Sequence, residues 1–542
     1  MTRLSLRLNS TRLHAQQAVG AASPSRAASD SPPRSCAAQP SSPVPLPAAC
    51  LVRLAAAGAI ALACLCVRAQ VSEFPLVSFP VDGDGLEPGL TVGPDGTLYG
   101  SSFWGRIFRV SPSGAGFKIL CQTGAVEVDY RLLLAWDGAL YGTTGSGGTN
   151  NDGTVFRINP DGTGYDVICQ FGAWLSGWVC GGSPSPGLIQ ARDGALYGAF
   201  PSPCGPPDQE QYGFVYRVNP DGSGFKVLHV FRGWPNRDGE EPRGPLVQGP
   251  DGALYGTTSG GSRFPNSWVN IIGGGMIQGP PGIVFKINSD GTGYRILHGF
   301  GDPAIYPVND GAWPRAGLTL GRDGALYGAT TIGGDNGAGT LFSIKPDGTG
   351  YASLCSFRDQ SPEGLLNWSD GQGYNSPSRE LLLASDGAFY GVIEHGGQWN
   401  RGEVFRYDPV ATNLTEVYSF TTNLWDGEGP LGTLVQGLDG ALYGTTWGGG
   451  RFGRGTVFRL ATPELGRAWQ APLFISVAAL PGGSVQVQLG GARNCSYRLD
   501  GSVNLVDWQP LTTFNNTSGL MEWTDLDAVN YPHRFYRAAM VP

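Results

Sequence analysis

The chain repeats a pattern of four short apolar runs separated by tight turns. One complete unit reads PLVQGPDGALYGTT (245–258), then GIVFKINSDGTGY (282–294), then RILHGF (295–300). We label its runs a (PLVQ), b (ALYGTT), c (IVFKI) and d (YRILHGF). Asp-Gly favours a tight turn because Gly accepts a positive φ and Asp hydrogen-bonds its own backbone. The pattern therefore predicts four short antiparallel strands in each unit.

The b run occurs seven times with little change. It reads DGTLYG from residue 95, DGALYG from 137, 193, 251, 323 and 439, and DGAFYG from 386, and a c run follows each copy. Four strands in a unit of this length are the signature of a propeller blade. A β-helix would need shorter and more uniform repeats. We therefore expect an all-β fold, a seven-bladed β-propeller over residues 70–462.

The two ends of the repeat region predict how the ring closes. The last c run, GTVFRL (455–460), has no d run after it, and an orphan run, FPLVSF (74–79), stands before the first a run. The orphan ends like the d run VYSF (417–420). The N-terminal segment is therefore expected to supply the outer strand of the last blade and to remove a seam that could fray.

The repeats stop near residue 467, and a different pattern follows. The runs LFISVAAL, SVQVQLG, SYRLDGSV, WQPLTTF, LMEWTD and RFYRAAM read as short strands. They predict a small Ig/fibronectin-like β-sandwich over residues 467–542.

At this level the chain resembles the GloVer-type tandem-repeat (choice-of-anchor) proteins, whose repeat is similar to DGALYGTT followed by GTVFRINPDGTGY. The resemblance covers about residues 74–460, and the segment YRLDGSVNLVDWQPL (497–511) looks like a terminal module of bacterial secreted proteins. The resemblance to the family implies an exported repeat protein, and it implies no particular activity.

Composition changes the picture at the N-terminus. Arg53 precedes an apolar run from Leu54 to Val67, and Ala69 ends a small-residue cleavage site. Residues 1–69 therefore read as a leader and signal peptide, too short in its apolar part for a membrane span. Without them the chain holds 29 basic and 43 acidic residues. An acidic chain of this kind argues against a nucleic-acid partner, and we expect a secreted or periplasmic monomer that does not insert into a membrane.

Tryptophan marks one face of the predicted propeller. Strand polarity brings the d–a and b–c loops to the same face, which we call the loop face, and the a–b and c–d turns to the other. Only Trp136 of the repeat region falls in an a–b turn. Indole rings stack on sugars and anchor other ligands, so we predict a ligand-binding role for the loop-face set; the alternative is that they pin Gly-rich loops. The residues are Trp104, Trp174, Trp178, Trp234, Trp268, Trp313, Trp399, Trp425 and Trp447, and Trp368 has the same position.

Two further recurrent positions carry polar or reactive side chains. An Asp stands eight residues before the a-run leucine in four units (Asp82, Asp238, Asp310 and Asp426), where it suits an Asx turn or, as the alternative, part of a calcium site. The fifth residue of run d is Cys121, Cys169, His229, His298 or Cys355 in five units. Because each lies in a different blade, we predict packing residues between blades and no metal site.

The remaining candidates are few. Cys180 and Cys204 lie in loops of one unit on the loop face, so they are predicted to form a disulfide. His395 beside Glu394 is the best candidate for a general base, and Glu240–Glu241 form a carboxylate pair, but no catalytic motif, cofactor or metal is indicated.

These observations favour a non-catalytic binding or display protein that recognises a glycan or a cell-surface partner through its loop face. An extracellular polysaccharide lyase or hydrolase with a site at the central channel, and a structural envelope protein, are the alternatives. Convergent carboxylates, or a His near a Tyr or Arg at the channel mouth, would favour the enzyme.

Overall fold

The computed structural model describes one part of the compact unit Ala69–Pro542. The predicted leader and signal peptide lie outside the described residues. The described residues are 72–78, 85–124, 131–149, 151–171, 179–180, 184–185, 187–201, 204–205, 211–233, 236–262, 267–271, 275–279, 281–301, 310–358, 379–423, 425–462, 465, 473–480, 482–490, 495–503, 508–516, 520–531 and 534–541.

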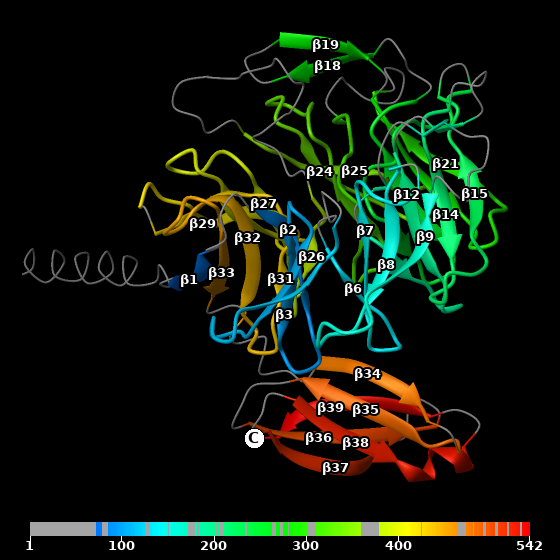
Figure 1. The fold of residues 1–542 in the computed structure, drawn as a ribbon, viewed down its shortest axis with the longest axis vertical. Helices are drawn as coiled ribbons and strands as arrows, with labels where there is room; N and C mark the ends of the chain where they lie inside the picture. Colours follow the sequence, from blue (N-terminus) through cyan, green and yellow to red (C-terminus); the bar gives the residue numbers. More distant parts are fainter. Residues whose placement is uncertain are drawn as a thin grey trace, which may run out of the picture. The chain divides into compact units, whose positions relative to one another are not determined.

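Six of the repeats fold into four-stranded antiparallel sheets whose strand order follows the chain, a-b-c-d (Figure 1). The a strands are only two residues long in most sheets because the turn into strand b begins at once. The sheets are β2(Leu86–Val92)–β3(Leu98–Ser102)–β4(Arg106–Val110)–β5(Lys118–Gln122), β6(Leu133–Leu134)–β7(Leu140–Thr144)–β8(Thr154–Ile158)–β9(Asp166–Gln170), β11(Ile189–Gln190)–β12(Leu196–Phe200)–β14(Phe214–Val218)–β15(Lys226–Val230), β16(Val247–Gln248)–β17(Leu254–Thr258)–β20(Ile283–Ile287)–β21(Arg295–Gly299), β22(Thr319–Leu320)–β23(Leu326–Ala329)–β24(Thr340–Ile344)–β25(Ala352–Ser356) and β26(Leu382–Leu383)–β27(Phe389–Ile393)–β28(Glu403–Asp408)–β29(Asn413–Ser419).

The last repeat takes its outer strand from the start of the described chain, as the sequence predicts. Strands β31(Val435–Gln436), β32(Leu442–Gly449) and β33(Thr456–Ala461) are followed in the sheet by β1(Ser72–Ser78), which pairs with β33 in an antiparallel register from Ser72↔Ala461 to Ser78↔Thr456. Strand β30(Gly427–Pro430) also pairs with β32. The two ends of the repeat region are thus joined by ladder hydrogen bonds.

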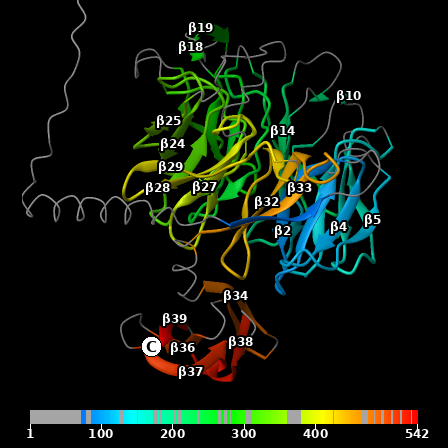
Figure 2. The same cartoon turned by 90° about the vertical axis from the view of Figure 1, so that its left-hand side faces the viewer.

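Buried side chains join each sheet to its neighbours along the chain. The first and last sheets share a cluster in which Leu90 and Phe108 pack with Tyr443 and Val457, all fully buried. Figure 2 shows the first sheet beside β32 and β33. Six similar clusters link the other consecutive pairs of sheets. The repeats therefore form a propeller-like all-β fold held by apolar contacts between sheets.

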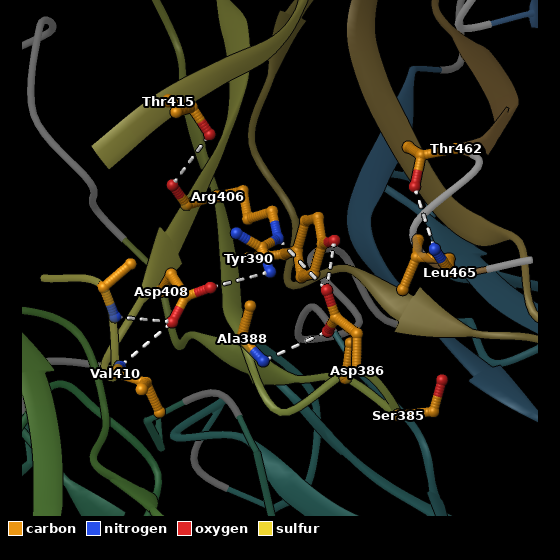
Figure 3. Close-up of polar contacts among 12 residues, drawn as sticks. Ser385, Asp386, Ala388, Tyr390, Arg406, Asp408, Val410, Thr415, Thr462 and Leu465 are labelled. Carbon is orange, nitrogen blue, oxygen red and sulfur yellow. Dashed lines mark hydrogen bonds and ion pairs between the residues drawn. The ribbon is translucent and has the colours of Figure 1, made fainter. Parts of the chain in front are cut away.

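The repeated DG–LYG phrase has a structural role. Figure 3 shows the hydrogen bonds that Asp386 makes in one of the repeats. Oδ1 of Asp386 accepts a hydrogen bond from the backbone N–H of Ala388 at 3.1 Å, which fixes the turn. Oδ2 accepts from the Tyr390 hydroxyl at 3.0 Å and from Nε of Arg406 on β28 at 3.1 Å. The same Tyr-to-Asp bond recurs at 2.7–2.9 Å in five other repeats. In these six repeats the phrase thus ties its turn to strand b, and in the Asp386 repeat it also ties the turn to strand c.

The glycine after the tyrosine has a steric reason. A Cβ at Gly391 would lie 2.4 Å from Cζ of Phe405, the apolar residue opposite it on strand c. The close contact is therefore within one sheet, between strands b and c. Only a residue without a side chain lets the phenylalanine ring cover the strand here.

One short hairpin and one two-residue strand pair lie in the b–c and d–a loops. Strands β18(Ser267–Ile271) and β19(Gly275–Gly279) pair within the longest b–c excursion. Strands β10(Val179–Cys180) and β13(Cys204–Gly205) bring together two loops of one repeat.

The C-terminal segment forms two three-stranded sheets. One consists of β34(Leu473–Ala479), β35(Val485–Gly490) and β38(Leu520–Asp525), and the other of β37(Gln509–Asn516), β36(Cys495–Ser502) and β39(Phe535–Val541); a 3₁₀ helix, η3, spans Leu526–Asn530. Val487 and Met521 of the first sheet pack with Tyr497 and Leu499 of the second, so the two sheets share one core.

Candidate binding sites on the loop face

A central cavity of about 240 Å³ lies where the chain enters the a strands. Its lining comes from six repeats, since residues that precede or begin β6, β11, β16, β22, β26 and β31 all contribute. Each a strand is entered from a d–a loop, so the cavity opens toward the loop face. Its described lining residues are Arg131, Leu132, Leu133, Gly187, Leu188, Ile189, Gln190, Arg243, Pro245, Arg315, Ala316, Gly317, Arg379, Glu380 and Thr433.

Four arginines and one carboxylate dominate the polar lining of this cavity. Nη1 of Arg131 lies 3.6 Å from Oε2 of Glu380, whose side chain is only 17% exposed. Burial raises the pKa of Glu380, and the charge of Arg131 opposes that shift. Arg243 donates from Nε to Oε2 of Glu241 at 3.0 Å, and Arg379 donates from Nε to the carbonyl of Leu431 at 3.0 Å. The cavity is thus a cationic site.

Sequence reasoning did not identify these arginines. Arg243 and Arg315 stand three residues before the a-strand leucine, Arg379 two residues before it and Arg131 one residue before it. The sequence does place a basic residue just before strand a in four repeats. Because its distance from the a-strand leucine differs between repeats, the position does not stand out as a repeated one. Only the convergence of the a strands brings the four side chains together.

A second cleft, of about 380 Å³, lies at the last two repeats and contains one of the predicted tryptophans. Trp447 is 45% exposed and shares the cleft with Arg401, Glu428, Asn423 and Arg451. A Cβ at Gly429 would lie 1.8 Å from Nε1 of the indole, so the ring edge rests directly on the Gly429 backbone. Arg401 and Glu428 form an ion pair. An aromatic surface thus stands beside several hydrogen-bonding groups.

The other predicted tryptophans have different surroundings. Trp104, Trp399 and Trp425 are 47%, 47% and 57% exposed, and Trp136 in its a–b turn is 67% exposed. Trp313 is only partly exposed; its φ is +55°, and the guanidinium of Arg315 lies 5.8 Å from its ring centre. Trp268 lies in β18. The predicted site residues Trp174, Trp178 and Trp234, with Trp368, lie outside the described residues.

The recurrent d-strand residues pack between sheets, as predicted. The imidazole of His229 stacks on Tyr294 of the next repeat with ring centres 3.7 Å apart, and His298 stacks on Tyr351 in the same way. Cys169 is buried in the cluster between its sheet and the next. Within the described part of the chain, no three His, Cys, Asp or Glu side chains gather as a metal site.

The recurrent aspartates hold the d–a loops, but through N–H groups that lie five to nine residues earlier in the chain, not through the Asx turns that the sequence suggested. Asp238 accepts from the backbone N–H of Arg232 at 2.9 Å, and Asp310 accepts from that of Gly301 at 3.1 Å. Oδ2 of Asp426 accepts from both the N–H and the hydroxyl of Thr421, at 2.7 and 2.8 Å. Asp82 lies outside the described residues.

The remaining candidates do not meet at one centre. Nδ1 of His395 is 3.9 Å from Oε1 of Glu394, and burial lowers the pKa of His395. Glu241 accepts from the Ser259 hydroxyl at 2.9 Å as well as from Arg243. The backbone register places Cys180 directly opposite Cys204. None of the described helices is long and apolar enough to cross a membrane.

The fold and these sites define an all-β tandem-repeat protein with a propeller-like core. The Gloeobacter/Verrucomicrobia repeat model matches residues 87–272 and 364–484, more than half of the chain. The chain therefore belongs to the Gloeobacter/Verrucomicrobia repeat family, which confirms the resemblance seen in its repeated phrases.

Several solved structures are similar to this chain at low identity. A virginiamycin B lyase from Staphylococcus aureus with quinupristin is 14% identical, with 72% of this chain and 99% of the lyase covered and a TM-score of 0.43. An oligogalacturonate lyase from Vibrio parahaemolyticus is 12% identical, with 73% and 95% covered and a TM-score of 0.46. A nidogen/laminin complex is 15% identical, with 62% and 92% covered and a TM-score of 0.36. No curated protein matches the chain. With TM-scores this low, these proteins say nothing about its substrate or mechanism.

Proposed function

We propose that this chain is a secreted, non-catalytic binding protein that recognises a glycan or a cell-surface partner through its loop face. Its scaffold would be a seven-bladed β-propeller over residues 70–462, closed by β1, with an Ig/fibronectin-like β-sandwich over 467–542 as an adhesion or sorting module. The apolar clusters between consecutive sheets and the β1–β33 pairing support the closed ring.

The observation that carries the proposed function is the cleft at Trp447. Sugars present both C–H faces, which stack on aromatic rings, and hydroxyl groups, which need hydrogen-bonding partners. Trp447 supplies the ring, and Asn423, Arg401 and Glu428 supply donors and acceptors beside it. The nearby exposed ring of Trp425 belongs to the same d–a loop as Asn423. The leader predicted from the sequence supports export.

The test is binding of the purified chain to a glycan array, with Trp447→Ala and Trp136→Ala variants in parallel. Trp136 is the matched control because it is at least as exposed but lies in an a–b turn, on the opposite face. Glycan binding that is lost only in Trp447→Ala supports the proposal. A folded wild-type chain that binds no glycan, or a Trp447→Ala variant that binds as well as wild type, contradicts the glycan form of it.

A polysaccharide-acting enzyme is the second candidate, and one observation favours it. Glu380 is a buried carboxyl with a raised pKa in the central cavity, which is how a general acid is kept protonated. The test is release of new reducing or unsaturated ends from acidic polysaccharides by wild type and by Glu380→Gln. Release by wild type but not by the variant would favour a lyase or hydrolase over a binding protein.

A further inference from the structure

The central cavity gathers basic side chains in a chain that is acidic outside its leader. We propose that it is a separate binding site for one acidic group, a carboxylate or sulfate of the kind carried by acidic sugars. This site goes beyond the Trp447 cleft, and it stands whether or not that cleft binds glycans. The ligand would be held by Arg243, Arg315, Arg131 and Arg379.

Arginine suits this role because its planar guanidinium offers five N–H donors in a fork that matches the two oxygens of a carboxylate or sulfate. Contacts with groups of the protein orient three of the four. Arg243 donates to Glu241, Arg379 donates to the carbonyl of Leu431, and Arg315 lies beside the ring of Trp313. Such contacts orient the guanidinium groups before a ligand arrives, which lowers the entropic cost of binding.

Charge makes the cavity selective for anions. Four guanidinium groups line it, against one carboxylate among the described lining residues, so positive charge predominates in the lining. An incoming anion is attracted by that charge, and because the side chains of Arg131 and Arg243 are 48% and 46% exposed, solvent and salt screen part of the attraction. Net charge cannot explain the cluster, because the chain carries 44 acidic and 36 basic residues in all.

The size and floor of the cavity limit what fits. Small-molecule sites usually span about 300–1,000 Å³, so a cavity of about 240 Å³ suits one sugar unit or an isolated acidic group. Leu132 and Leu188, both buried, provide an apolar floor. A Cβ at Gly317 would lie 2.8 Å from Oε1 of Glu380, so glycine leaves room for that carboxyl among the arginines.

The experiment is calorimetric titration of the purified chain with sodium sulfate, sodium glucuronate and, as a neutral control, glucose, at an ionic strength held constant with NaCl. Arg243→Gln and Arg315→Gln should each weaken anion binding about tenfold, the loss typical of a charged hydrogen bond. Glu380→Gln should tighten it, because the one carboxylate among the described lining residues is removed. Arg454→Gln, at an exposed position outside the cavity, should change nothing. Thermal unfolding of each variant confirms that it is folded.

The outcomes separate the ligands and can overturn the site. Binding of glucuronate alone supports a carboxylate-bearing sugar, and binding of sulfate alone supports a sulfated one. No binding of either anion to folded wild type overturns the site. Equal binding by Arg243→Gln, Arg315→Gln and wild type also overturns it. Because these probes do not require Trp447, a Trp447→Ala variant should bind sulfate normally even if it has lost every glycan.

Discussion

Nη1 of Arg131 lies 3.6 Å from Oε2 of Glu380, although the two residues enter the a strands of different sheets, β6 and β26. This ion pair bridges separate repeats at the central cavity. The protonation state of the Glu380 carboxyl therefore affects the net charge of the cavity lining.

The first prediction concerns pH. Burial raises the pKa of Glu380, so on acidification it becomes neutral at a higher pH than an ordinary carboxyl. The facing groups Arg131, Arg243, Arg315 and Arg379 stay charged, and Glu241 is engaged by Arg243. Sulfate keeps its charge over this range, so its affinity should rise as pH falls through the pKa of Glu380. Titrations between pH 5 and 8 check this, and Glu380→Gln should show a much flatter profile.

The second prediction concerns the repeated Asp–Tyr pair. In the last repeat, Oδ2 of Asp439 accepts from the Tyr443 hydroxyl at 2.8 Å and from Nη2 of Arg459 at 2.7 Å. Tyr443→Phe removes one bond and should cost about 1 kcal/mol in unfolding free energy. Asp439→Ala should cost more, about 2–3 kcal/mol, since it leaves a buried hydroxyl and a guanidinium without their acceptor. Urea unfolding measures both; equal losses would contradict this account of the phrase.

The third prediction compares two glycines of strand β32. A Cβ at Gly444 would lie 2.4 Å from Cζ of Phe458, whereas at Gly448 the nearest atom would be 3.6 Å away. Gly444→Ala should therefore destabilise the chain by at least about 1–3 kcal/mol, as overpacking does, while Gly448→Ala should be nearly neutral. The melting temperatures of the two variants test this prediction. A Gly444→Ala variant as stable as wild type would show that the Phe458 ring can move aside.

The fourth prediction concerns a buried carboxyl at the start of β28. Burial, and secondarily Glu416, raise the pKa of Glu403 from 4.5 to about 7, and its side chain is 7% exposed. Between these values the unfolded chain has lost a proton that the folded chain retains, so stability should fall as pH rises, by about 3 kcal/mol in total.

Chemical unfolding at pH 4.5 and pH 8 measures this loss. Glu403→Gln should abolish most of the difference. Glu416→Gln is the informative control, because burial is the larger cause and most of the pH dependence should remain. A wild-type stability that does not change over this range would refute the assignment.

The fifth prediction is the Cys180–Cys204 disulfide. Directly paired residues of antiparallel strands lie within bridging distance at the backbone. Peptide mapping of the unreduced purified chain should recover the two cysteines as one cross-linked fragment. Cys180→Ser with Cys204→Ser should lower stability by about 3 kcal/mol, the value expected for a loop of this length. Recovery of both residues as free thiols would exclude the bond.

The sequence predicts those features that depend on local pattern. The four-strand unit, the pairing of the FPLVSF segment with the last c strand, and the packing role of His229 all follow from periodicity and position. The Arg131–Glu380 pair does not, because it depends on how the a strands converge, and the arginines stand at different offsets in different repeats. The contact between Gly391 and the ring of Phe405 cannot be predicted for a similar reason. The repeated glycine indicates that no side chain fits at this position, but the sequence does not show which residue occupies the space.

The pairing of β1 with β33 also sets an order of events during synthesis. β1 is among the first strands of the repeat region to leave the ribosome, and its partner is the last, so their contact has the greatest sequence separation in the sheet. Contacts between distant segments form slowly. Until the final repeat is translated, β1 has no strand to pair with, and the apolar face around Leu90 remains uncovered. A chain that stops before β32 would therefore expose this face to aggregation and proteolysis, which gives the cell a simple basis for removing incomplete copies.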